Sequence, residues 1–144
     1  MVSHYNVIAN ITQLTTYESY YRNQQCIESQ ALLGLLPFSH IYGLVVMAHV
    51  APYRGDEVIV LPKYTLETLL AAVERFKIHQ INIAPPILVH MVTNPDICKK
   101  YNLSSLRFVY TGGAPLASET MDALSVLYPK WHIGQIYGER HLVD

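Results

Sequence analysis

Charged residues are scarce in this chain of 144 residues, and neither sign dominates. Asp, Glu, Lys and Arg together make up 15% of the sequence, and ten basic against eleven acidic side chains give a net charge of −1. Nucleic-acid binding depends on clustered basic side chains that neutralise phosphates. The densest basic cluster here is the pair Lys99-Lys100. The composition therefore excludes nucleic acid as an expected partner.

Cysteine is also rare, and no long hydrophobic run occurs. Cys26 and Cys98 form no CxxC motif, and the seven histidines show no pair at metal-ligand spacing. We therefore expect two reduced thiols and no metal site. The richest apolar stretch, residues 41–51, is interrupted by His49 and is too short to cross a bilayer. The first residues lack the pattern of a signal peptide. These features predict a cytoplasmic protein without a membrane span.

Several catalytic motifs are missing from the sequence as well. It contains no GxSxG, no GxGxxG and no GxxxxGK[ST]. Ser39 and His40 are sequence neighbours, so their side chains should point in different directions and not form a nucleophile–base pair. We therefore expect no catalytic residue within this chain.

Hydrophobic residues make up 51% of the sequence, which argues for a packed core and against disorder. Short apolar runs alternate with segments of helical periodicity. Strands are expected at 31–36, 58–61, 81–84, 108–111 and 132–137, and helices at 3–22, 41–50, 65–76, 87–92 and 117–128, with a loop at 94–96. The strands are apolar on both sides, as in buried parallel sheets. The sequence predicts one α/β domain, a mostly parallel sheet with helices on both faces.

Three predicted strands are followed by segments that could bind a ligand, because ligands of such sheets bind beyond the carboxyl ends of the strands. The segments are Leu-Pro-Phe-Ser-His-Ile-Tyr-Gly at 36–43, Tyr-Thr-Gly-Gly-Ala-Pro-Leu at 110–116 and Gly-Gln-Ile-Tyr-Gly at 134–138. Gly113 lets a flat ring approach the backbone, Tyr137 offers a stacking face, and Gln135 offers an amide to a base edge. Taken singly, each segment is more often an ordinary turn or helix start.

Taken together and in this order, the three segments resemble the large domain of adenylate-forming acyl-CoA synthetases, with the 4-coumarate–CoA ligase-like branch nearest in character. The first resembles the family's LPFFHIYG, the second its SGAAPL or SGGAPL, and the third the start of GQGYGMTE. The opening Met-Val-Ser-His-Tyr-Asn at 1–6 resembles the MLSHRN stretch that follows the family's phosphate loop. The resemblance identifies residues 1–144 as one incomplete AMP-binding domain, a central part of the large domain.

The resemblance implies an activity. The family joins a carboxylic acid to ATP, releases pyrophosphate, and passes the acyl group to coenzyme A, so ATP, Mg2+ and CoA are the implied cofactors. It places His40 and Tyr42 by the acyl pocket and Gly113 between acyl group and adenine. The residues implied for the nucleotide are Gly113, Ala114, Pro115, Gln135, Tyr137 and Gly138.

The chain also departs from the family pattern. The phosphate loop would precede Met1, and the Met-Thr-Glu that follows Gly138 in the family is replaced by Glu139-Arg140-His141. Ile136 stands where the family has a glycine. The ribose-binding aspartate and the lid domain fall outside the match. Because losing one preorganised donor typically costs about 10²–10³ in rate, we expect this chain alone to be inactive.

Two other interpretations stay open. The chain could be a non-catalytic module that binds an acyl or adenine ligand or another protein. The scarcity of charge in residues 1–53 favours this, because exposed apolar surface promotes association, including self-association. The weaker alternative is an unrelated nucleotide-binding α/β domain, against which the missing phosphate loop argues.

Overall fold

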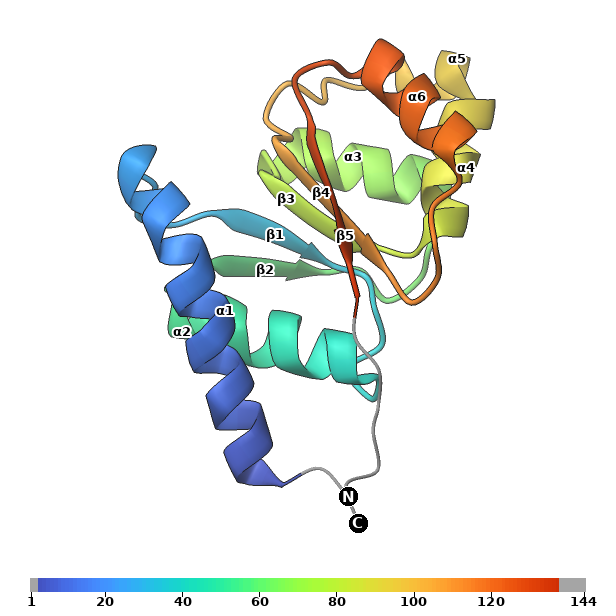
Figure 1. Ribbon diagram of the computed structural model, residues 1–144. Helices are drawn as coiled ribbons and strands as arrows, with labels where there is room; N and C mark the ends of the chain where they lie inside the picture. Colours follow the sequence, from blue (N-terminus) through green and yellow to red (C-terminus); the bar gives the residue numbers. More distant parts are fainter. Residues whose placement is uncertain (1–2, 138–144) are drawn as a thin grey trace.

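The computed structural model describes residues 3–137, which form an α/β domain around one five-stranded sheet (Figure 1). The strands, in chain order, are β1 (Ala31–Gly34), β2 (Glu57–Val60), β3 (Gln80–Ile83), β4 (Phe108–Gly112) and β5 (His132–Ile136). Their spatial order is β2-β1-β3-β4-β5, and every neighbouring pair is parallel. The predicted parallel sheet is confirmed. All five strands therefore end at the same edge.

The main core lies where α3 (Leu66–Phe76), α4 (Pro85–Thr93) and α6 (Ser118–Leu127) cover one face of the sheet (Figure 1). Thr65 caps α3: its hydroxyl accepts the Thr68 N–H at 3.1 Å, and the Thr68 side chain accepts the Thr65 N–H in return. The apolar stripe at helical spacing then faces the sheet, and its buried members are Leu66, Leu69, Leu70, Ala72 and Val73. Local sequence pattern is sufficient to explain this layer.

The opposite face carries α1 (His4–Gln24), the π-helix η1 (Gly43–Val50) and the short α2 (Ala51–Tyr53) (Figure 1). Met47 and Ala51 pack on Leu32 of β1 and Val58 of β2 in a second, smaller core. Helices thus lie on both faces, as predicted. A Cβ on Gly43 would lie 2.3 Å from the Pro37 carbonyl oxygen, so the start of η1 requires a glycine.

One detail of the predicted secondary structure is wrong. The expected loop at 94–96 contains the start of a short helix, α5 (Pro95–Cys98), because proline at the first helical position favours a helix. The helix predicted at 3–22 is present as α1, but its apolar residues are not fully buried: Ile8 is 59% exposed, and Val7, Ile11 and Leu14 are only partly buried. Of the residues of α1, all of which the structure describes, only Arg22 is buried.

A buried ionic network attaches α1 to the rest of the domain. The Asp56 carboxylate accepts from both terminal nitrogens of Arg22 at 2.9 and 3.0 Å, from Arg54 Nε at 3.0 Å and from the Gln30 N–H at 2.9 Å. Arg54 also pairs with Glu18 of α1. Burial lowers the pKa of the Arg54 guanidinium, and the Asp56 charge opposes that effect. The two carboxylates, Glu18 and Asp56, and the two guanidinium groups therefore neutralise one another on the face of the sheet that carries α1.

None of the helices between residues 3 and 137 combines the length and the apolar character that a membrane crossing requires.

Candidate functional site

The carboxyl ends of β4 and β5 bring two of the predicted ligand-binding segments together. Gly112 pairs in register with Ile136, so the loop after β4 and the residues after β5 leave the sheet side by side. The Gln135 side-chain oxygen accepts the Leu116 N–H at 3.2 Å, which links the two segments directly. The Gln135 amide nitrogen, the other end of the same group, takes no part in this hydrogen bond, and its role toward a base edge stays a prediction. The structure thus joins segments that are about twenty positions apart in the sequence.

Gly113 shapes the loop between them. Its φ of +83° lies in the left-handed region, and an added Cβ would meet no atom within 4 Å. Glycine is therefore required by the backbone conformation and not by crowding. Gly113, Ala114 and Pro115 are all exposed, so the loop presents its backbone to an incoming molecule.

The third segment reaches the same edge through Tyr42. The Tyr42 hydroxyl donates to Asn82 Oδ1 of β3 at 3.2 Å, and its ring lies 3.4 Å from where a Cβ on Gly112 would be. Burial, and to a smaller extent Tyr110, raises the pKa of Tyr42. Tyr42 therefore stays a neutral donor at physiological pH. It connects the start of η1 with the ends of β3 and β4.

His40 is less integrated into this site. Its Nδ1 accepts the Tyr42 N–H at 3.2 Å, its N–H donates to the Pro37 carbonyl at 3.0 Å, and its side chain is exposed. These contacts fix the turn before η1. A role for His40 in an acyl pocket therefore stays a prediction. So does the nucleotide role of Tyr137, which is 83% exposed, while Gly138 lies outside the described residues.

Asn82 and Gly134 contribute to the packing at this edge of the sheet in ways that the sequence did not predict. Asn82 is 1% exposed, and its Nδ2 has no hydrogen-bond partner within the described part of the chain. An asparagine between Ile81 and Ile83 in an apolar strand was the signal that could have identified it. Gly134 makes room for the Tyr110 ring, since a Cβ there would lie 2.7 Å from that ring.

No group of three or more His, Cys, Asp or Glu side chains that could hold a metal ion occurs among residues 3–137.

Comparison with known proteins agrees with this architecture. A family model described as "AMP-binding enzyme" matches residues 1–139. The chain belongs to the AMP-binding enzyme family. Among curated members, the acyl-CoA ligase gloD of Glarea lozoyensis is 40% identical over 137 residues, which are 95% of this chain and 23% of that protein. The 4-coumarate–CoA ligase-like 3 protein of Arabidopsis thaliana is 36% identical over 132 residues, covering 91% of this chain and 24% of that protein.

Solved structures of other proteins show the same fold. The luciferase-like enzyme of the mealworm Zophobas morio matches 94% of this chain and 30% of its own with a TM-score of 0.74 at 22% identity. A red-emitting luciferase from Phrixothrix hirtus matches 76% of this chain and 26% of its own with a TM-score of 0.68 at 30% identity. The predicted family and fold are confirmed. The chain spans about a quarter of the length of the curated relatives described above.

Proposed function

We propose that this chain supplies part of the adenine and acyl sites of an ATP-dependent acyl-CoA ligase. The observation that carries the proposal is the hydrogen bond from Leu116 N–H to Gln135 at the carboxyl edge, beside the left-handed turn at Gly113. It brings two exposed backbone segments together where ligands of parallel sheets bind. Curated relatives of the chain are acyl-CoA ligases, and one structure of similar fold is described as ATP-bound.

The proposed reaction has two steps. The oxygen of a carboxylate attacks the α-phosphorus of ATP and displaces pyrophosphate, and the thiol of CoA then attacks the acyl carbon and displaces AMP. In this proposal, Gly113, Ala114 and Pro115 lie along the adenine, and the Gln135 amide nitrogen donates to its edge. His40 and Tyr42 contact the acyl side. Tyr137 and Gly138 complete the adenine site.

The resemblance implies magnesium as a cofactor of this reaction, and residues 3–137 contain no group of three or more His, Cys, Asp or Glu side chains that could hold the ion. Positioning and charge stabilisation at the phosphates dominate such transfers, and the 144 residues contain no glycine-rich phosphate loop. We therefore expect the polypeptide alone to show no exchange of labelled pyrophosphate into ATP. Exchange above that of a heat-treated control would contradict this. We also propose a cytoplasmic location, with which the two unpaired cysteines agree.

AMP binding tests the nucleotide site independently of catalysis. A titration with AMP, followed by amide NMR, should shift the signals of residues 112–114, 116 and 135–137 in a saturable way. Gly113→Ala should weaken AMP binding about tenfold or more, because it strains the loop that faces the base. Gly55 is a matched control: its φ is +75°, and an added Cβ would also meet nothing within 4 Å. Gly55→Ala should leave AMP affinity unchanged. Equal effects of the two substitutions, or no saturable binding, would contradict the proposal.

A role as an interaction module is the second candidate, and the exposed side of α1 favours it. Tyr5 and Ile8 are 78% and 59% exposed on this helix. Sedimentation velocity across a hundredfold concentration range should show self-association that Ile8→Glu abolishes. A single monomeric species at every concentration would argue against it.

A further inference from the structure

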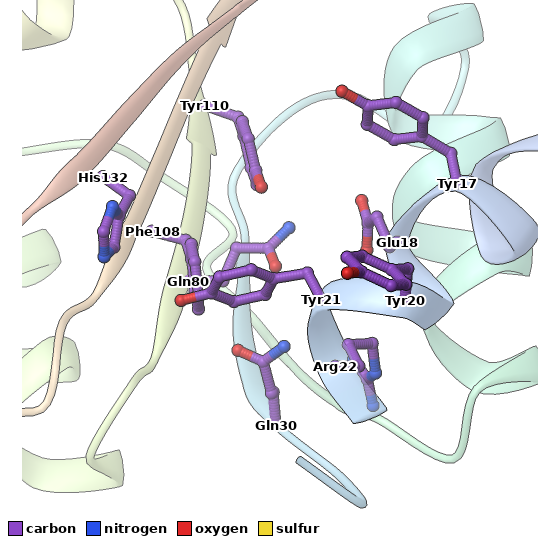
Figure 2. Close-up of a pocket in the computed structure, with 10 residues that line it drawn as sticks. All are labelled: Tyr17, Glu18, Tyr20, Tyr21, Arg22, Gln30, Gln80, Phe108, Tyr110 and His132. Carbon is purple, nitrogen blue, oxygen red and sulfur yellow. The ribbon is translucent and has the colours of Figure 1, made fainter. Parts of the chain in front are cut away.

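A cavity lies away from the carboxyl edge, between the last turns of α1 and the amino-terminal ends of β3, β4 and β5 (Figure 2). Its volume is about 390 Å³. Its sheet side is formed by Gln80, Phe108, Tyr110 and His132. Gln80, Phe108 and His132 are the first residues of their strands, whereas Gly113 and Gln135 lie at or beyond the other ends. The cavity is therefore separate from the proposed nucleotide site.

The sheet side of this cavity is a row of nearly parallel rings. Phe108 and Tyr110 have ring centroids 6.3 Å apart and planes within 7° of each other. Phe108 and His132, which pair in register across β4 and β5, have centroids 5.6 Å apart and planes within 25°. Such a row suits another flat ring, because aromatic groups pair well in offset-stacked or edge-to-face arrangements.

The helix side is also aromatic. The edge of Tyr21 meets the ring of Phe108 at a centroid distance of 5.5 Å and an angle of 89°, which closes part of the cavity. Tyr17 and Tyr20 line it too, yet they are 85% and 72% exposed (Figure 2). Large aromatic side chains that stay exposed around a hollow are typical of a binding surface and not of a core.

The charges of the cavity wall are already neutralised. Glu18 pairs with Arg54, and Arg22 pairs with Asp56. These ion pairs also hold the end of α1 in place, where Tyr21 contacts Phe108 while Tyr17 and Tyr20 stay exposed. An ionic ligand would find no unpaired counter-charge among them, so the wall favours a neutral one.

We propose that this cavity binds a neutral planar aromatic molecule of one or two rings that carries a polar substituent such as a hydroxyl. The volume falls in the range of small-molecule sites, roughly 300–1,000 Å³. Tyrosine hydroxyls and the Gln80 amide can pair with the substituent. The site is independent of the acyl-CoA ligase function proposed above.

The experiment uses 2-naphthol as the probe and 2-decalol, its saturated counterpart, as the control ligand. Binding is followed by NMR on the full chain at a concentration where sedimentation shows one species. 2-Naphthol should bind saturably and shift signals of Tyr21, Phe108 and His132, and 2-decalol should bind at least about fivefold more weakly. Tyr20→Ala should weaken 2-naphthol binding about three- to tenfold. Tyr5→Ala removes an equally exposed tyrosine of the same helix, outside the cavity, and should change nothing.

Three results would overturn the proposal. The first is equal binding of 2-decalol. The second is an identical effect of Tyr20→Ala and Tyr5→Ala, which would mean non-specific adsorption to α1. The third is displacement of 2-naphthol by saturating AMP, which would place the cavity within the nucleotide site.

Discussion

Replacing Asp56 by asparagine should be among the most destabilising single-atom changes in this domain. The Asp56 side chain is 0% exposed and accepts four hydrogen bonds, three from guanidinium groups and one from the Gln30 N–H. Asparagine keeps the shape but replaces one acceptor oxygen by a donor that faces the arginines. Arg22 and Arg54, with side chains 9% and 3% exposed, then keep only Glu18 as counter-charge. Breaking a buried pair in this way costs about 3–5 kcal/mol.

This free energy converts to a measurable shift in melting temperature. The entropy of unfolding is about 2.1 cal/mol/K per residue, which gives about 0.3 kcal/mol/K for a chain of 144 residues. Asp56→Asn should therefore lower Tm by about 10–16 °C in differential scanning calorimetry. If α1 detaches before the rest unfolds, the shift will be smaller, and the amides of residues 4–24 will exchange with solvent faster than in the wild type.

Asp96 provides the control for the Asp56 experiment. It pairs with Lys99 at 3.3 Å, but the two side chains are 92% and 71% exposed. Exposed pairs contribute about 0–1 kcal/mol, so Asp96→Asn should shift Tm by less than about 3 °C. An Asp56→Asn protein that melts like Asp96→Asn, with unchanged exchange in α1, would refute the argument that the buried network attaches the helix.

Three further predictions concern the sheet and its edge. Tyr42→Phe should lower the free energy of unfolding by about 1–3 kcal/mol in urea titration, because it leaves the buried Asn82 Oδ1 without the hydroxyl that donates to it. The double variant Tyr42→Phe, Asn82→Leu should recover part of this loss. Gly134→Ala should destabilise by about 1–3 kcal/mol, since the new Cβ would lie 2.7 Å from the Tyr110 ring, and adding Tyr110→Ala should relieve that overlap. Burial, with a smaller effect of a nearby arginine, lowers the pKa of His79 below 6.5, so the imidazole binds a proton more readily in the unfolded chain than in the folded one. The free energy of unfolding should therefore fall as the pH drops below 6.5. His79→Asn should reduce that loss, measured by urea titrations at pH 7 and pH 5.

The sheet could be predicted from the sequence because its signals are local. Each strand is a short apolar run that ends at proline, glycine or a polar turn, and α3, which covers the main core, shows a 3.6-residue period. The Thr65 cap and the apolar stripe after it are complete within twelve residues. The loop predicted around Pro95 failed because proline both interrupts and begins helices, and the local sequence does not distinguish these roles.

The attachment of α1 could not be predicted because it depends on pairs far apart in the sequence. Glu18 and Arg54 are separated by 36 positions, and Arg22 and Asp56 by 34. One signal was present: residues 1–53 contain only Glu18, Arg22 and Glu28 as charged side chains, and the first two enter the buried network. The scarcity of charged side chains indicated that residues 1–53 are covered by other parts of the protein, but it did not indicate which of the charged side chains are buried.

The predicted ligand-binding segments show the same difference between features set by local sequence and features set by tertiary structure. Their position at the carboxyl edge followed from the parallel order, and the Gln135–Leu116 hydrogen bond agrees with that placement. The aromatic cavity was not predicted, because its walls come from a helix and three strands that only the tertiary structure brings together.

The attachment of α1 by ion pairs helps to explain why an aromatic cavity lies beside this helix. An α-helix held by an apolar stripe would pack closely on the sheet, and its aromatic side chains would fill the space beneath it. The only buried residue of α1 is Arg22, so ion pairs at the helix end do the work that apolar packing does for α3. The ion pairs act at the last turns of α1, and the helix also packs on η1, with Val7, Ile11 and Leu14 only partly buried. Tyr17 and Tyr20 consequently stay exposed beside a hollow, and the same ion pairs that attach the helix remove net charge from the cavity wall.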